Sequence, residues 1–130
     1  MIDLDYYNPL TQQILGAAFE VHRVLGFGYL ESVYQKAMEH ELGLRGIPFQ
    51  SQARIDVRYK KILAGYYVPD LLVFEDIIVE LKAQEKVDLE AMQTIMINHM
   101  VCLESEVSLM LNFGLPSLEH KRYLIPRKHQ

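Results

Sequence analysis

The sequence predicts an α/β domain in which a mixed sheet is flanked by helices and the elements follow the order α-α-β-β-β-α-β-β. Two observations predict this fold class. Apolar residues recur at helical spacing through the first third of the chain and again near residues 88–103. Elsewhere, short runs rich in β-branched residues alternate with glycine, proline and charged turns, which is the pattern of strands.

Two consecutive helices are predicted before residue 47. Asn8-Pro9 is typical of a helix start because proline is favoured in the first turn, and this helix is expected to end near Gly26. The second helix is expected to begin after Gly28 and to end near Gly43. The apolar positions that predict their buried faces are Leu10, Ile14, Ala17, Ala18, Val21 and Leu25, then Leu30, Val33, Tyr34, Ala37, Met38 and Leu42.

An antiparallel meander of three strands is predicted next. Residues 55–59 alternate apolar and polar side chains, and Lys60-Lys61 forms the turn that follows them. Residues 62–74 form the second strand, which is interrupted by Gly65 and by Pro69, and the missing N–H of proline restricts it to an edge, a bulge or a bend. The β-branched run Ile77–Lys82 forms the third strand.

The last predicted elements are one helix and two strands. Asp88 can cap a helix in which Met92, Met96 and Met100 form a stripe that is expected to fill the core. Residues 107–113 predict a fourth strand, and residues 122–125 predict a short fifth one.

The composition predicts a single domain over residues 1–130, because half of the chain is hydrophobic and its length supports a core without disulfides. The one cysteine, Cys102, and the lack of zinc-ligand spacing favour a cytoplasmic location.

An acidic N-terminus and the lack of any apolar run of roughly 18 residues argue against membrane functions. The net charge of −4 argues against binding nucleic acid by bulk charge, so such a partner would need a local basic surface or metal ions.

Three charged residues of the predicted meander carry the strongest chemical signal. Glu80 and Lys82 lie two apart on a strand, so their side chains share one face. Asp70 lies on the preceding strand, and the turn between them can bring the two carboxylates together. Two close carboxylates favour a hard divalent cation, Mg²⁺ or Mn²⁺, and the lysine would then face metal-bound water. The alternative is an exposed face with a cross-strand ion pair.

Such a site requires that Asp70 point to the same sheet face as Glu80. A symmetrical two-residue turn would place Asp70 on the opposite face, because side chains alternate along a strand. We therefore predict a three-residue turn centred near Glu75, which places Asp70 opposite Glu80, or a bulge near Pro69.

Pro69-Asp70 followed by Glu80-Leu81-Lys82 resembles the signature of the PD-(D/E)XK nuclease superfamily, whose core order is α-β-β-β-α-β. The segment Gly28-Tyr29-Leu30-Glu31-Ser32-Val33-Tyr34 resembles the Gly-x-x-Glu-x-x-Tyr element of the GxxExxY family, a group of small proteins within that superfamily. Further blocks similar to this family are Val21-His22-Arg23, Leu25-Gly26, Leu44–Phe49 and Leu111–Gly114.

The resemblance implies a restriction-endonuclease-like fold and a metal-dependent nuclease that hydrolyses nucleic-acid phosphodiester bonds. It implies that Asp70 and Glu80 bind Mg²⁺ or Mn²⁺ with the Leu81 carbonyl as a third ligand, and that Lys82 is the catalytic lysine. Glu31 matches an acidic residue that superfamily members often project from the first core helix toward the metal. DNA is the expected substrate with RNA left open, and a homodimer would suit a small nuclease that cuts two strands.

Four further residues are candidates for supporting roles or for core packing. Tyr34 lies one turn after the helical glutamate, and it either supports the site or packs in the core. His22 and His99 lie on apolar helical faces, where hydrogen-bonded core histidines are common. Relatives carry a glutamine where this chain has Ile95, so Gln93 can take that role only if the helix starts or kinks differently.

Basic residues crowd the last ten positions, and this tail either contacts phosphate or is simply solvated: Lys121, Arg122, Arg127 and Lys128. A competing hypothesis is a non-catalytic module that keeps the nuclease fold and binds nucleic acid or protein. The presence of all four polar positions of the signature favours the enzyme: Glu31, Asp70, Glu80 and Lys82.

Overall fold

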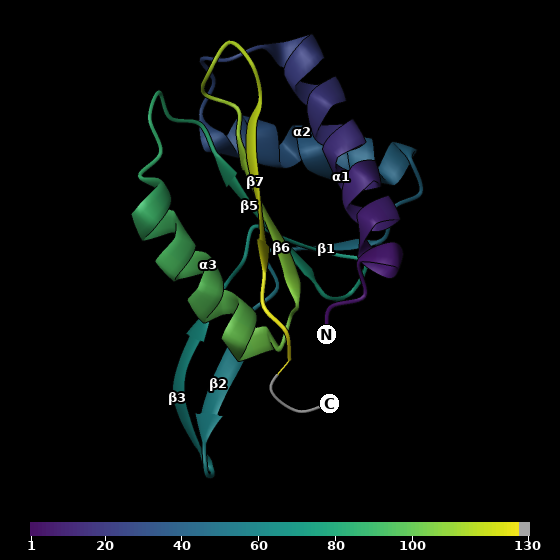
Figure 1. The fold of residues 1–130 in the computed structure, drawn as a ribbon. Helices are drawn as coiled ribbons and strands as arrows, with labels where there is room; N and C mark the ends of the chain where they lie inside the picture. Colours follow the sequence, from purple (N-terminus) through teal and green to yellow (C-terminus); the bar gives the residue numbers. More distant parts are fainter. Residues whose placement is uncertain (128–130) are drawn as a thin grey trace.

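A five-stranded mixed sheet forms the centre of the computed structural model, which describes residues 1–127 (Figure 1). In spatial order its strands are β1 (Phe49–Ser51), β4 (Leu71–Val73), β5 (Ile77–Lys82), β6 (Val107–Asn112) and β7 (Glu119–Leu124). β5 and β6 pair in parallel, and the other neighbours pair antiparallel. The predicted α/β class with a mixed, helix-flanked sheet is confirmed. None of the helices in the described part of the chain is both long and apolar enough to cross a membrane.

Helices cover both faces of this sheet. α1 (Leu4–Leu25) and α2 (Glu31–Leu44) lie on one face, and α3 (Leu89–Leu103) lies on the other (Figure 1). Because side chains alternate along β5, Val79 and its same-face neighbours pack in the core under α1 and α2, whereas Ile78 packs under α3. The predicted methionine stripe is buried in this second core, so its assignment as core filling is confirmed.

The start of α1 differs from the prediction. The Asp3 side chain accepts a hydrogen bond from the Tyr6 N–H, so the helix begins at Leu4 and Pro9 lies inside it. Tyr7, which the earlier start brings into the helix, is buried and donates its hydroxyl to Asp76 at 3.0 Å. This capping and anchoring explain why the helix extends one turn before Asn8-Pro9.

The predicted three-stranded meander is wrong in one respect. β2 (Ile55–Tyr59) and β3 (Ile62–Tyr67) pair only with each other and form a separate two-stranded hairpin that projects from the body (Figure 1). In the chain, the hairpin lies between β1 and β4, which pair with each other in the main sheet. It is therefore an insertion between two neighbouring strands of that sheet. β1, only three residues long, is too short for an alternating pattern to predict it. Residues 62–74 are accordingly two strands, β3 and β4, and not one.

The turn between β4 and β5 confirms the predicted register. Val73 pairs with Ile77, so the turn contains three residues and is centred on Glu75. Phe74 and Glu75 both have positive φ, 53° and 74°, and these left-handed conformations close the turn. Extending the register by one pair from Leu71 and Val79 places Asp70 opposite Glu80.

Candidate active site

Asp70 and Glu80 come together at the end of the β4–β5 pair. Both carboxyl groups are partly buried, and burial followed by the charge of Glu80 raises the pKa of Asp70 to about 6. The Leu81 N–H and the charge of Lys82 oppose this increase. Repulsion between the two carboxylates thus contributes to the raised pKa after burial, and a cation between them would relieve that repulsion.

The backbone of Leu81 contributes to the same place. Its N–H donates to Asp70 Oδ2 at 2.7 Å. The N–H and C=O of one strand residue point to the same side, so the Leu81 carbonyl is also directed toward the Asp70 side of β5, away from β6. The Leu81 side chain is buried in the core under α1 and α2, so Leu81 offers backbone atoms only.

Glu80 faces α3, where it meets His99. The Oε1 atom of Glu80 lies 3.4 Å from His99 Nδ1, and within residues 1–127 neither buried atom has a hydrogen-bond partner. The His99 ring stacks on Tyr67 with centroids 4.0 Å apart, and the Tyr67 hydroxyl donates to the His99 carbonyl at 2.5 Å. His99, which the apolar character of its helix face assigned to the core, therefore lies at the candidate site and is fixed in orientation by the base of the hairpin.

Glu31 approaches from the other side of the sheet edge. It lines an open cavity of about 410 Å³ together with Asp70 and Leu81, whereas Glu80 and Lys82 do not line it. Glu31 is the first residue of α2 and is exposed. Asp70 is thus the residue shared by the cavity and by the carboxylate pair on the α3 side.

Gln35 is a residue of this cavity that sequence reasoning missed. It is buried, one turn after Glu31 on α2, and its Nε2 donates to the backbone carbonyl of Asp70 at 2.9 Å and to Glu39 Oε2 at 2.9 Å. Ser51 Oγ also donates to Glu39 Oε2, at 2.6 Å. A buried polar residue one helical turn from the signature glutamate is the signal that could have identified Gln35.

Lys82 is the last residue of β5, and hydrogen bonds from the end of β6 fix the backbone that follows it. Its carbonyl accepts from the Phe113 N–H at 2.8 Å, and the buried side chain of Asn112 bonds to both the N–H and the carbonyl of Gln84. A Cβ on Gly114 would overlap backbone atoms of residues 83–84, so glycine is required there. Lys82 itself is partly exposed on the same sheet face as Glu80.

The candidates for supporting roles lie elsewhere. Tyr34 is fully buried, stacks on Phe113 at 4.7 Å, and donates its hydroxyl to the Gly26 carbonyl at 2.7 Å. The His22 Nε2 lies 2.8 Å from the Leu115 carbonyl. Gln93 is exposed on α3, between the buried methionines.

Lys121, Arg122 and Arg127, the basic residues of the tail that the structure describes, do not form one patch. Lys121 is exposed on β7, and Arg122 donates to Asn8 Oδ1 at 2.6 Å on the α1 face. Arg127 lies at the opposite end of β5 from Glu80, 3.8 Å from Asp76. Lys128 lies outside the described residues.

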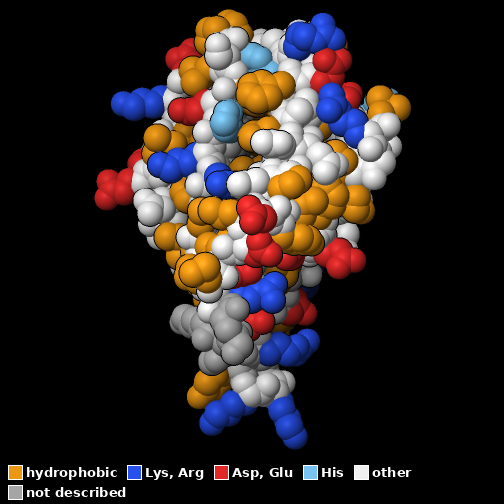
Figure 2. Space-filling view, turned by 45° about the vertical axis from the view of Figure 1, so that its right-hand side comes forward, with side chains coloured by type: hydrophobic (Ala, Val, Ile, Leu, Met, Phe, Trp, Pro, Cys, Tyr) orange, Lys and Arg blue, Asp and Glu red, His pale blue; other side chains and the backbone are white. Residues whose placement is uncertain are grey.

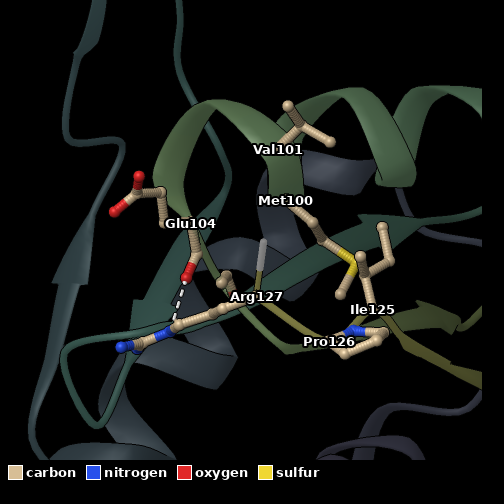
Figure 3. A pocket seen from close by; sticks show the side chains of 7 residues that line it. Met100, Val101, Glu104, Ile125, Pro126 and Arg127 are labelled. Carbon is tan, nitrogen blue, oxygen red and sulfur yellow. Dashed lines mark hydrogen bonds between the residues drawn. The ribbon is translucent and has the colours of Figure 1, made fainter. Parts of the chain in front are cut away.

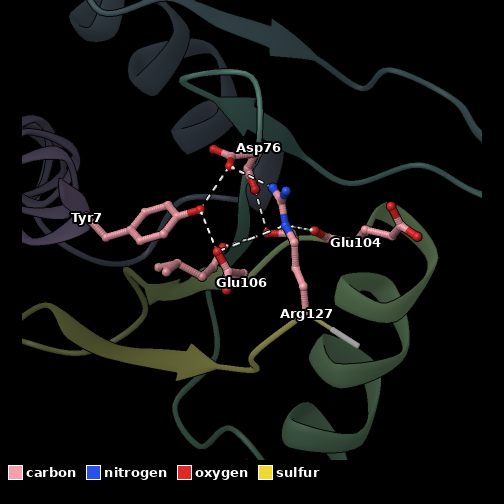
Figure 4. Close-up of polar contacts among 7 residues, drawn as sticks. Tyr7, Asp76, Glu104, Glu106 and Arg127 are labelled. Carbon is pink, nitrogen blue, oxygen red and sulfur yellow. Dashed lines mark hydrogen bonds and ion pairs between the residues drawn. The ribbon is translucent and has the colours of Figure 1, made fainter. Parts of the chain in front are cut away.

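A second polar cluster lies at that opposite end, where β5 and β6 begin. The Tyr7 hydroxyl contacts Asp76 and Glu106, while Arg127 pairs with both carboxylates and donates to the Glu104 carbonyl at 3.1 Å (Figure 4). Burial, followed by the charge of Asp76, raises the pKa of Tyr7. A cavity of about 260 Å³ adjoins this cluster between the end of α3 and residues 125–127 (Figure 3). The cluster joins α1 to the start of the sheet, away from the candidate site.

The residues at the C-terminal end of β5, beside Asp70, fit a divalent cation. Glu80 Oε1 is buried without a hydrogen-bond partner beside a second carboxylate, and oxygen donors are those that Mg²⁺ and Mn²⁺ prefer. Residues 1–127 contain no group of three or more His, Cys, Asp or Glu side chains arranged to hold a metal ion. The oxygen atoms available at this end are therefore those of two carboxylates and of one backbone carbonyl.

Comparison with known proteins agrees with the fold. No curated protein matches this chain. The crystal structure of SSO0001 is similar, with a TM-score of 0.55 and 12% sequence identity over 73% of this chain and 50% of that one. The chain thus spans about half the length of that protein, and at this identity the likeness concerns the fold alone.

A family model described as the PD-(D/E)XK nuclease superfamily matches residues 8–123. Because that match covers most of the chain, from α1 to β7, the protein belongs to the PD-(D/E)XK nuclease superfamily.

Proposed function

We propose that the protein is a metal-dependent nuclease that hydrolyses nucleic-acid phosphodiester bonds at the C-terminal end of β5, beside Asp70. The observation that carries the proposal is the pairing of Asp70 with Glu80 on the sheet face that also carries Lys82. The three-residue turn creates this arrangement, since a turn one residue shorter would have separated the carboxylates. Membership of the superfamily supports a nuclease-type activity.

The chain's own residues have distinct roles in this proposal. Asp70, Glu80 and the Leu81 carbonyl hold Mg²⁺ or Mn²⁺, and the Leu81 N–H keeps the Asp70 carboxylate oriented at 2.7 Å. The bound cation supplies an acidified water and neutralises phosphate charge. Lys82 orients the attacking water or stabilises the charge that develops on phosphate.

Two residues act from opposite sides of the carboxylate pair. Glu31 lines the same cavity as Asp70 and would add a further carboxylate on that side of the site. His99 lies on the α3 side, with its Nδ1 3.4 Å from Glu80, and is itself positioned by Tyr67. Gln35 fixes the backbone of Asp70.

We assign the chain, as one nuclease domain over residues 1–130, to the GxxExxY family on the segment from Gly28 to Tyr34. Tyr34 supports that segment, because its hydroxyl contacts the Gly26 carbonyl and the Tyr29 N–H. DNA is the proposed substrate, and a homodimer would allow both strands of a duplex to be cut.

The test is a cleavage panel of labelled single-stranded, duplex and branched DNA and RNA with Mg²⁺, Mn²⁺ or chelator. We expect cleavage that requires metal and that Asp70→Ala abolishes. Asp88→Ala is a matched control, because Asp88 caps α3 on the surface. Metal-dependent cleavage that persists in Asp70→Ala would contradict the assignment of the site. Binding without cleavage of any substrate would instead support the non-catalytic module.

A further inference from the structure

The hairpin formed by β2 and β3 differs in charge from the rest of the molecule. Residues 54–67 contain four Arg and Lys against one Asp, whereas the whole chain contains 13 Lys and Arg against 17 Asp and Glu. Basic side chains gather at the lower end of the molecule, where the hairpin projects (Figure 2). The hairpin is thus a local basic surface on an acidic protein, which is what a protein of this net charge needs to approach nucleic acid.

The basic residues of the hairpin fall into two groups. Arg54 and Arg58 pair with Asp56 at 2.8 and 3.7 Å, and Arg54 also lies 3.9 Å from the centre of the Tyr66 ring. Lys60 and Lys61, at the tip, are exposed and have no acidic partner among the described residues. The Lys60 ammonium lies 5.4 Å from the centre of the Tyr59 ring, and the tip therefore presents two exposed positive charges that no carboxylate of the described residues neutralises.

Apolar and aromatic side chains accompany this charge. Tyr59 and Ile62, which pair across the two strands next to the tip, are 61% and 62% exposed, and Tyr66 is 58% exposed. Within residues 1–127 this hairpin is a separate two-stranded sheet, and α3 is the helix that packs against its β2 strand. Exposed aromatic rings beside lysines are suited to sugars and base edges, whereas a solvated turn does not need them.

The base of the hairpin adjoins the candidate active site. Tyr67, the last residue of β3, is stacked on His99, and three residues later the chain reaches Asp70. A strand of five residues spans about 16 Å at roughly 3.3 Å per residue, which is close to half a helical turn of B-DNA. A nucleic acid held along the hairpin would therefore pass the carboxylates at its base.

We propose that the β2–β3 hairpin is a DNA-binding arm that enters the major groove of a duplex, with Lys60 and Lys61 on the phosphates that border it. The major groove of B-DNA is about 12 Å wide and accepts a two-stranded β-ribbon, whereas the deep, narrow major groove of A-form RNA does not. The inference rests on the proposed nuclease function for its choice of nucleic acid as partner. It deepens that function by assigning duplex DNA as the substrate class and the hairpin as the element that holds it.

The test measures binding without cleavage. The affinity of a fluorescent DNA duplex is titrated in chelator over a range of salt concentrations for the parent and for Lys60→Ala/Lys61→Ala. Each lost phosphate contact lowers the slope of log K against log salt by about 0.9, so we expect the slope to fall by about two. Arg23→Ala/Arg45→Ala removes the same charge away from the hairpin, at the C-terminal ends of α1 and α2, and should leave the slope unchanged. An RNA duplex of the same sequence should bind more weakly and with no dependence on the hairpin lysines.

The outcomes separate this inference from the nuclease proposal. An unchanged slope in the hairpin variant of a protein that cleaves duplex DNA would overturn the arm and leave the nuclease intact. A reduced slope in a protein that cleaves nothing would support the arm and contradict the nuclease. Equal losses in the two double variants would indicate bulk charge alone and overturn the arm. A protein that binds no DNA, but whose oligomeric state changes in Lys60→Ala/Lys61→Ala, would also overturn the arm. The lysines would then serve to prevent strand pairing between copies of the hairpin, a known role of lysines on edge strands.

Discussion

Replacement of Asp70 by asparagine tests the electrostatic basis of the site in the metal-free protein. The pKa of Asp70 rises from 3.8 to about 6 on folding, so the folded chain holds this proton more tightly than the unfolded chain. The resulting stabilisation is fully present only below the unfolded pKa of 3.8, and it is lost as the pH rises through about 6. At pH 8 the ionised carboxyl therefore destabilises the fold, and asparagine removes that penalty while its oxygen still accepts from the Leu81 N–H.

The magnitude follows from the size of the shift. About two pKa units correspond to roughly 3 kcal/mol, since one unit is about 1.4 kcal/mol. Asp70 is only partly buried, and solvent screens part of the repulsion, so we expect about 1–2 kcal/mol. For a domain of this length that is a rise in Tm of about 3–8 °C.

The assay is thermal unfolding by circular dichroism in chelator at pH 4 and pH 8. We expect Asp70→Asn to melt higher than the parent at pH 8 and by a much smaller margin at pH 4, where the carboxyl of Asp70 is neutral in the folded state. Asp88→Asn is the control, because asparagine is an equally good helix cap. This variant should have the same Tm as the parent at pH 4 and at pH 8. A variant that melts lower than the parent at pH 8 would refute the reasoning, since Asp70 would then be stabilised by an ion pair with Lys82.

Three further predictions concern the neighbourhood of the site. Lys82→Ala should slow cleavage by about a hundredfold or more and leave Mn²⁺ affinity unchanged in calorimetric titration, because the ammonium acts on water or phosphate and is no ligand. Tyr34→Phe should lower the free energy of unfolding by about 1–2 kcal/mol in denaturant titration, since the hydroxyl is the partner of a backbone carbonyl and N–H in the loop before α2. Gly114→Ala should destabilise by about 3 kcal/mol because its Cβ would overlap the backbone of residues 83–84, whereas Gly43→Ala, with no atom near an added Cβ, should be neutral or stabilising.

Each of these outcomes can contradict its premise. Lys82→Ala that cuts at the parent rate would make the lysine a surface residue, and a lower Mn²⁺ affinity would make it part of the metal site. An unchanged denaturation midpoint in Tyr34→Phe would show that water replaces the hydroxyl. Equal stability of the Gly114→Ala and Gly43→Ala variants would show that the chain after β5 yields to the added methyl group.

Much of the fold is encoded locally, and those parts agree with the prediction. α3 begins after Asp88 because its side chain caps the Ala91 N–H, and its methionines recur on one face. β5 is recognisable from its β-branched residues, and β6 from an apolar run that is buried throughout. The start of α1 escaped prediction because the cap at Asp3 and the anchoring of Tyr7 on Asp76 and Glu106 compete with the ordinary preference for proline in the first turn.

The chain by itself determined which residues can share a face. Glu80 and Lys82 point the same way because strand side chains alternate, and the requirement that Asp70 join them selected the three-residue turn that the structure contains. These are consequences of short sequence separation, for which backbone geometry alone is sufficient.

The tertiary structure decided everything that depends on contacts between distant segments. It brought Gln35 of α2 to the backbone of Asp70, Glu31 of α2 to the cavity that Asp70 lines, and His99 of α3 to Glu80. It also separated the hairpin from the main sheet, although β2 alternates like a half-buried strand. Alternation reports that a strand has two different faces, but the layer that covers one of them is supplied by other parts of the chain, and no local pattern contains that information.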